Sequence, residues 1–160
     1  MPHPTSGSAL SPETQLDRAA ARCRARGTSL TPIRRKVLDL LLGEPGGLKA
    51  YDLLDRMKEV HTATTPPTTV YRALDFLIEQ GLAHKIARTN QFVACNHACH
   101  EDASLFLICP GCGVITELHD EQVLEALSLS LEQAGHRLAG PEIELSARCR
   151  NCMAAPRRPR

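Results

Sequence analysis

The chain lacks the long hydrophobic runs that membrane proteins need. Its 160 residues contain no stretch of about 18 consecutive apolar residues. The N-terminus, MPHPTSGSALSPE, does not have the basic and then apolar layout of a secretory signal. Internal repeats and long low-complexity tracts are also missing, and the hydrophobic content of 42% is that of a globular protein. We therefore expect a cytoplasmic chain of one ordinary domain or two small ones, without a membrane partner.

Signatures of zinc enzymes are missing as well. The sequence has no HExxH motif and no His-x-Glu paired with PCxxC. It also has no recognisable signature of a substrate pocket. We predict that the chain is not an enzyme and has no small-molecule substrate.

Charge is nearly balanced overall but uneven along the chain. The formal net charge is +1. Residues 1–95 hold 13 Lys and Arg against 9 Asp and Glu, whereas residues 96–160 hold 6 against 9. A basic first half could face the phosphates of a nucleic acid, although so small an asymmetry often has no function.

Cysteine is plentiful, with seven residues. Disulfides are rare in a reducing cytosol, which makes metal binding the leading explanation. Cys109-Pro-Gly-Cys112 and Cys149-Arg-Asn-Cys152 are two CxxC pairs with 36 residues between them. Together they supply four thiolates for a closed tetrahedral zinc site, which is structural because no position stays open for water. A redox pair or disulfides are the alternatives, and the second CxxC argues against both.

A second group of metal-binding residue types lies between the two halves. Four of them fall within six residues of sequence: Cys95, His97, Cys99 and His100. His84 precedes this segment, and Glu117 follows Cys112 by five residues. Such a density favours metal binding, and ligands from both halves could close on one ion.

The first half has the pattern of a winged helix. We expect helices at 11–26, 31–43, 49–59 and 66–81, followed by two short strands at 82–86 and 91–94. In a winged helix the last helix enters the major groove of DNA and the hairpin touches the backbone. Other small α+β domains share this order of elements.

The spacing of apolar residues changes in the second half of the chain, and the new pattern predicts a smaller α/β unit. Strands are expected at 104–109, 114–119 and 141–147, with an amphipathic helix at 120–134. That helix would expose an apolar face made of Val123, Leu124, Leu127 and Leu131. Dimerisation is the natural way to cover such a face.

These observations predict an α+β protein in five parts. They are a flexible N-terminus (1–10), a winged-helix DNA-binding domain (11–95), a hinge (96–103), a dimerisation and structural zinc domain (104–153) and a basic tail (154–160). Cys23 lies on an apolar helix face, and we expect it to be a small buried side chain.

Three segments resemble the ferric uptake regulator family, and its zinc-sensing branch most of all. They are YDLLDRMKE, PPTTVYRALDFLIEQGLAHK, and CPGCG with the distal CRNC, and the likeness extends over residues 11–152. It implies a homodimer with an N-terminal winged helix and a C-terminal dimerisation lobe. It also implies that the protein binds double-stranded operator DNA and represses metal-uptake genes when metal is bound.

The resemblance also implies two Zn²⁺ sites per chain. The structural zinc would be held by Cys109, Cys112, Cys149 and Cys152. The regulatory zinc would be held by His84, Cys95, His100 and Glu117, and His97 or Cys99 could replace His100. A thiolate from Cys95 favours zinc over a harder octahedral ion. The alternative is a sister sensor that answers to iron, manganese, nickel or peroxide.

For DNA, the resemblance points to Tyr51 and Arg72. An outward guanidinium on the groove helix can bind the O6 and N7 atoms of guanine, and Thr69 and Tyr71 could reach phosphate or base methyl groups. Tyr71 could equally belong to the core. Further backbone contacts could come from the basic residues of the first two helices: Arg22, Arg24, Arg34, Arg35 and Lys36. An outward Arg72 argues against a zinc module that binds only proteins.

Overall fold

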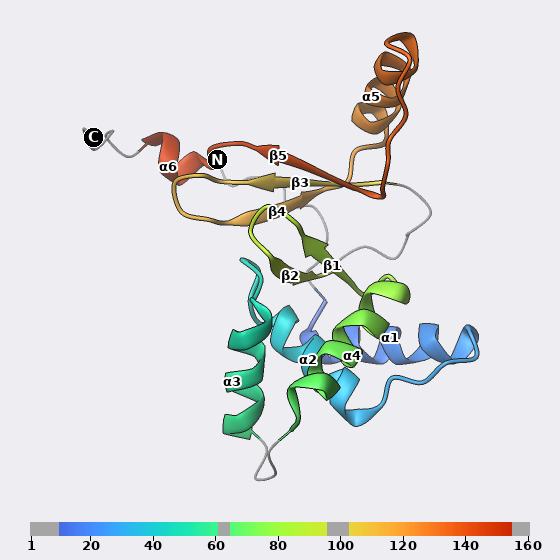
Figure 1. The fold of residues 1–160 in the computed structure, drawn as a ribbon, viewed down its shortest axis with the longest axis vertical. Helices are drawn as coiled ribbons and strands as arrows, with labels where there is room; N and C mark the ends of the chain where they lie inside the picture. Colours follow the sequence, from blue (N-terminus) through green and yellow to red (C-terminus); the bar gives the residue numbers. More distant parts are fainter. Residues whose placement is uncertain (1–9, 61–64, 96–102, 155–160) are drawn as a thin grey trace.

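The structure, a computed structural model, describes residues 10–60, 65–95 and 103–154. Figure 1 shows two lobes, of which the N-terminal lobe comprises α1–α4 with β1 and β2, and the C-terminal lobe comprises β3 to α6. The helices are α1 (Pro12–Ala25), α2 (Pro32–Leu42), α3 (Ala50–Val60), α4 (Pro67–Glu79), α5 (Glu121–Gln133) and α6 (Arg150–Ala154). The strands are β1 (Ala83–Ile86), β2 (Gln91–Ala94), β3 (Ser104–Ile108), β4 (Ile115–Leu118) and β5 (Glu142–Ser146). The predicted α+β class is confirmed.

Local sequence accounts for where the N-terminal helices begin and end. The hydroxyl of Ser11 accepts a hydrogen bond from the Thr14 N–H (3.2 Å), and proline stands in the first turn of α1, α2 and α4. Thr31, where the predicted helix begins, stands at the cap position of α2, but its side chain makes no capping hydrogen bond. The predicted helix ends at Gly81, whereas Gln80 caps α4 and Gly81 follows it with a φ of 65°.

The core of the N-terminal lobe is built mainly from apolar side chains of its four helices. Cys23, Leu53, Met57, Val70 and Leu77 are each 0% exposed, and Cys23 is thus the buried side chain that its helix position predicts. Within the described residues, no helix has the length and apolar character needed to cross a bilayer.

The hairpin of β1 and β2 follows α4 as predicted. The strands pair antiparallel with Ala83 opposite Ala94 and Ile86 opposite Gln91. A β-bridge between Leu48 and Phe92, which we did not predict, adds a third segment to this hairpin. We refer to the hairpin with its turn at residues 87–90 as the wing.

In the C-terminal lobe, β3 is the central strand of a three-stranded sheet. It pairs antiparallel with β4 and parallel with β5. Residues in register share a face of the sheet, so Phe106 forms a row with Glu117 on β4 and Glu144 on β5. This face turns toward the wing, where an apolar cluster of Ile86, Val93, Phe106, Ile108 and Ile115 joins the two lobes.

Helix α5 projects away from this sheet (Figure 1). Val123 is 42% exposed and Leu129 is 54% exposed, whereas Leu127 and Leu131 are half-buried. The prediction was wrong for Leu124, which is only 9% exposed. The short helix α6 was also not predicted; it contains Cys152.

Candidate metal centres and nucleic-acid interface

The two CxxC pairs meet at one edge of the C-terminal sheet. Cys109 follows β3 directly, and Cys149 comes shortly after β5. Because these two strands are parallel, they end at the same edge. The sulfurs of Cys109, Cys112, Cys149 and Cys152 all lie within 4.8 Å of one another, and those of Cys112 and Cys149 are 3.7 Å apart. The structure thus brings all four predicted residues together.

Backbone N–H groups point at the sulfur of Cys109. Cys149 donates at 3.3 Å and Gly111 at 3.4 Å. Backbone hydrogen bonds from Cys149, then Cys112 and then Gly111 lower the pKa of Cys109 to about 6. Hydrogen bonds to the sulfurs of Cys112, Cys149 and Cys109 raise the pKa of Cys152 to about 12, because its proton is shared with its neighbours. One sulfur is thus ready to ligate, whereas another must first lose its proton.

The turn between Cys109 and Cys112 leaves no room for a side chain. A Cβ added to Gly111 would lie 2.9 Å from the sulfur of Cys152. Four sulfurs, two N–H donors and a glycine that lets the turn approach α6 are the parts expected of a closed thiolate site for a soft tetrahedral ion. The donor set therefore fits Zn²⁺.

The second group of ligands bridges the two lobes. His84 lies on β1, Cys95 directly follows β2, and Glu117 lies on β4. One ligand atom from each lies within 4.8 Å of the others. Oε1 of Glu117 is 3.9 Å from His84 Nε2 and 3.9 Å from Cys95 Sγ. The other three predicted ligands, His97, Cys99 and His100, lie outside the described residues.

Two side chains of this group are buried, and Cys95 is half-buried. The side chains of His84 and Glu117 are 7% and 6% exposed. Burying a carboxylate is costly unless a cation or hydrogen bonds compensate its charge. An imidazole, a thiol and a carboxylate in such a place fit a borderline-soft ion such as Zn²⁺.

Two further contacts of His84 were not foreseen in the sequence. Its Nδ1 lies 3.4 Å from Oε1 of Glu142 on β5, and its ring lies 5.0 Å from that of Phe106 between centroids, at an interplanar angle of 59°. No motif marks Glu142, which comes close to His84 only through the parallel pairing of β5 with β3.

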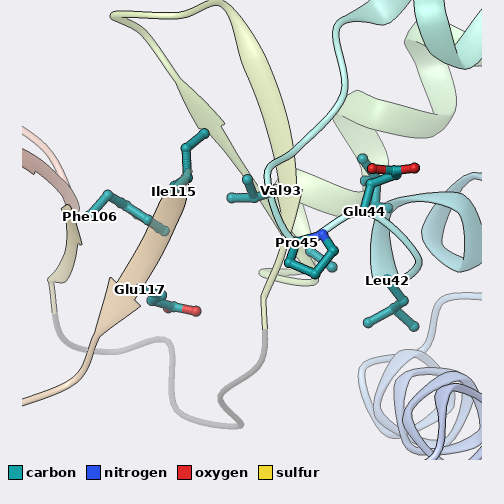
Figure 2. Close-up of a pocket in the computed structure, with 9 residues that line it drawn as sticks. Leu42, Glu44, Pro45, Val93, Phe106, Ile115 and Glu117 are labelled. Carbon is teal, nitrogen blue, oxygen red and sulfur yellow. The ribbon is translucent and has the colours of Figure 1, made fainter. Parts of the chain in front are cut away.

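A pocket beside the second group also spans both lobes. Figure 2 shows Glu117 and Ile115 on β4 and Phe106 on β3 at one side, with Val93 of β2 and the segment from Leu42 to Pro45 at the other. A change in the position of the wing would therefore alter the surroundings of Glu117.

The predicted DNA residues are accessible to differing degrees. Tyr51 is 60% and Tyr71 is 48% exposed, so Tyr71 is not a core residue. Arg72 is exposed and Thr69 is half-buried, and both line a groove with Ala73 and residues 31–34. This groove lies between the start of α2 and the exposed side of α4.

Three of the five predicted basic residues make intramolecular contacts. The Arg34 guanidinium lies 3.5 Å above the Phe76 ring and donates to the Ser29 carbonyl at 2.7 Å. Arg35 pairs with Asp17 at 2.9 Å and Lys36 with Asp39 at 2.8 Å. Arg22 and Arg24 lie in the last turn of α1.

Comparison with known proteins gives the family. Residues 25–146 match the model of the ferric uptake regulator family. The chain belongs to this family. Among members of the ferric uptake regulator family, it is 38% identical to the zinc uptake regulation protein of Escherichia coli (strain K12) over 141 residues, which are 86% of this chain and 81% of that protein.

Solved structures agree with this assignment. A zinc uptake regulator complexed with zinc and DNA is 35% identical, with a TM-score of 0.77 over 90% of this chain and 96% of that one. Holo XcZur is 37% identical, with a TM-score of 0.76 over 89% of this chain and 99% of that one. Apo XcZur, at 36% identity over 89% and 98% of the chains, has a TM-score of 0.53.

Proposed function

We propose that this member of the ferric uptake regulator family is a zinc-dependent transcriptional repressor. It binds operator DNA as a dimer when its regulatory site is filled, and it controls zinc uptake genes. The observation that carries the proposal is the position of the second ligand group, in which His84 lies on the wing, Cys95 directly follows the wing and Glu117 lies on the C-terminal sheet. A metal ion held there joins the lobe that reads DNA to the other lobe.

The two metal centres have different roles in this proposal. Cys109, Cys112, Cys149 and Cys152 hold a structural zinc within one lobe. The regulatory zinc is held by His84, Cys95 and Glu117, with a fourth ligand from His100, His97 or Cys99. These assignments give two zinc ions per chain, and residues 96–103 form the hinge between a DNA-binding domain (11–95) and a dimerisation domain (104–153).

The residues of the regulatory site hold the wing against the sheet. Bound zinc supplies positive charge and directional bonds that offset the buried carboxylate and thiolate. His84 and Cys95 fix the two wing strands, Glu117 fixes β4, and the cluster around Phe106 keeps water from the contact. The higher TM-score with holo than with apo XcZur, at nearly equal identity, supports an arrangement of lobes that depends on metal.

DNA is read by α4 and by neighbouring residues of the N-terminal lobe. The guanidinium of Arg72 makes two hydrogen bonds with guanine. Thr69 and Tyr71 lie on the same helix, and Tyr51 contacts DNA from α3. Two such helices can read a palindrome only when their separation fits successive major grooves. The likeness to a zinc uptake regulator complexed with DNA supports this arrangement.

The experiment that tests the proposal compares metal content with DNA affinity. Mild chelation of the purified dimer should leave one zinc per chain and abolish binding to a duplex selected by the zinc-loaded protein from a random pool. Zinc at a buffered free concentration should restore binding. Because DNA and zinc affinities are linked, DNA should tighten zinc binding by the same factor, a coupling of about 1–3 kcal/mol.

Cys95→Ser isolates the regulatory site. This variant should stay a folded dimer with one zinc per chain and lose zinc-dependent DNA binding. Cys23→Ala is the matched control, because it removes a buried thiol of the same lobe without touching the ligand group. Undiminished, chelator-sensitive binding by Cys95→Ser would remove Cys95 from the sensing site.

The same titration separates zinc from the metals of sister sensors. The thiol of Cys95 favours zinc over iron or manganese. The protein with an emptied regulatory site should therefore recover DNA binding at a lower buffered concentration of Zn²⁺ than of Fe²⁺ or Mn²⁺. Recovery by another ion at lower concentration would identify a sister sensor instead.

A further inference from the structure

Strand β5 carries two carboxylates that reach across to the wing. Glu142 approaches His84, and Glu144 accepts hydrogen bonds from the backbone N–H groups of Ala87 (2.6 Å) and Arg88 (3.0 Å). The two glutamates are two residues apart on one strand and therefore share the face that turns toward the wing. Strand and wing thus meet at two points, which fixes the register between them.

The contact of Glu142 is with the nitrogen of His84 that faces away from the other ligands. Nε2 of His84 lies on the side of Glu117, at 3.9 Å, whereas Nδ1 lies 3.4 Å from Glu142 Oε1. The Glu142 side chain is 28% exposed, compared with 7% for His84, so the carboxylate borders solvent on one side. A cavity lined by His84, Glu142, Ser104 and Arg26 lies on that side of the ring.

A neutral imidazole binds a metal ion through the nitrogen that carries no proton. A carboxylate that accepts the proton of one nitrogen therefore leaves the other free to ligate and makes it more basic. Ring packing against Phe106 limits rotation of the imidazole. His84 is thus held so that its Nε2 can serve as the ligand atom.

We infer that Glu142 is a positioning residue for the regulatory metal site. It holds the proton of His84 on Nδ1 and orients the ring, while Glu144 keeps the wing turn at the distance this contact needs. The inference rests on the proposed function in taking His84 as a ligand. It adds that the affinity of the site is set partly from β5, a strand that contributes no ligand of its own.

The test measures zinc affinity and the proton position of His84 in protein that retains its structural zinc. Affinity for the regulatory zinc is obtained by competition with a chromophoric chelator. The proton position is obtained from long-range ¹H–¹⁵N spectra of protein labelled with ¹⁵N-histidine, with the His84 signals identified by their loss in His84→Ala. Glu142→Ala should weaken regulatory zinc binding by about 10- to 100-fold and mix the two tautomers.

Two matched variants sharpen the result. Glu142→Gln retains an oxygen that accepts the Nδ1 proton, so it should keep the wild-type tautomer and recover most of the affinity. Glu79→Gln removes the same charge from an exposed side chain that lines the same cavity, so zinc affinity should stay at the wild-type value. Both controls have the same length of side chain as the residue they replace.

The outcomes separate this inference from the proposed function. Wild-type affinity and an unchanged tautomer in Glu142→Ala would overturn the role of Glu142. Equal weakening in Glu79→Gln would also overturn it, because general charge around the cavity would then be responsible. A wild-type protein that takes up no second zinc, or that binds DNA equally well without it, would contradict the proposed function instead.

Discussion

At the scale of single residues, Gly111 occupies a position that leaves no space for a side chain. Its added Cβ would lie 2.9 Å from the Cys152 sulfur and 3.1 Å from the Cys152 Cβ. Gly111→Ala should therefore displace α6, cost about 1–3 kcal/mol of folding stability and speed zinc loss to a chelator. Gly140→Ala is the control, because nothing lies within 4 Å of its added Cβ. Equal zinc retention in both variants would contradict this view of the turn.

The pKa values of the cluster predict how its metal affinity depends on pH. Cys152, with a pKa of about 12, must lose a proton whenever it binds metal, so affinity should rise with pH. Cys109, with a pKa of about 6, is already a thiolate above that pH and competes with protons only below it. A plot of log affinity against pH should therefore become steeper by one unit below about pH 6. Chelator competition corrected for chelator protonation measures this, and a single slope throughout would contradict it.

Arg72 and Lys85 should affect DNA binding in different ways. Arg72→Ala should cost about 1–3 kcal/mol and relax the choice of base at one position in each half-site, because it would remove the proposed bidentate contact with guanine. Lys85 is exposed on the wing, and Lys85→Ala should weaken binding to all sequences and lower the salt slope by about 1. Fluorescence anisotropy with single-base variants of the duplex, over a range of salt, separates the two. If Arg72→Ala loses affinity without a change in base preference, Arg72 contacts the DNA backbone and not a base.

The site residues differ in how far sequence alone could predict them. The spacing of the CxxC pairs predicts the cluster of four sulfurs, because each pair forms a local turn. Predicting His84, Cys95 and Glu117 required two further signals, the density of metal-binding residue types and the family resemblance. The structure brings these three residues together. Glu142 could not be predicted, because its contact with His84 depends on the pairing of distant strands.

At the scale of elements, Gly47 allows the third segment to join the wing. Its φ is 76°, and an added Cβ would lie 2.8 Å from Val93 Cγ1 and 2.9 Å from the Phe92 carbonyl oxygen. Gly47→Ala should break the bridge between Leu48 and Phe92 and lower stability by about 1–3 kcal/mol. Gly46→Ala, with nothing within 4 Å, is the neighbouring control in thermal or urea unfolding. Equal stability of the two variants would show that the bridge contributes little.

Elements with strong periodicity were predictable from sequence. All predicted helices and strands are present, because proline, serine and glycine mark the ends of α1, α2 and α4 and apolar spacing marks their buried sides. The bridge at Leu48 was missed because a single bridging residue shows no alternating pattern in the sequence. Helix α6 was missed because its five residues contain no apolar repeat that would mark a helix in the sequence.

At the scale of the whole molecule, apolar surface on the C-terminal lobe predicts a dimer. Val123, Leu129, Leu138 and Leu145 are between 38% and 54% exposed in the single chain. Leu129→Glu should shift the protein from dimer to monomer, because it places a charge in the surface that association would bury. Leu129→Met retains an apolar side chain of similar volume and should remain dimeric. Analytical ultracentrifugation with zinc analysis checks both, and a dimeric Leu129→Glu would place the interface elsewhere.

The parallel pairing of β3 with β5 has a consequence for protein turnover. Cys109 and Cys149 are 40 positions apart, and a metal ion held by both would close a ring that includes helix α5. Loss of that ion would remove the restraint on the segment that carries β4, α5 and β5, and we expect the dimer contact to be lost together with the zinc. Severe zinc starvation would then expose the chain to proteases, whereas milder starvation would only release it from DNA.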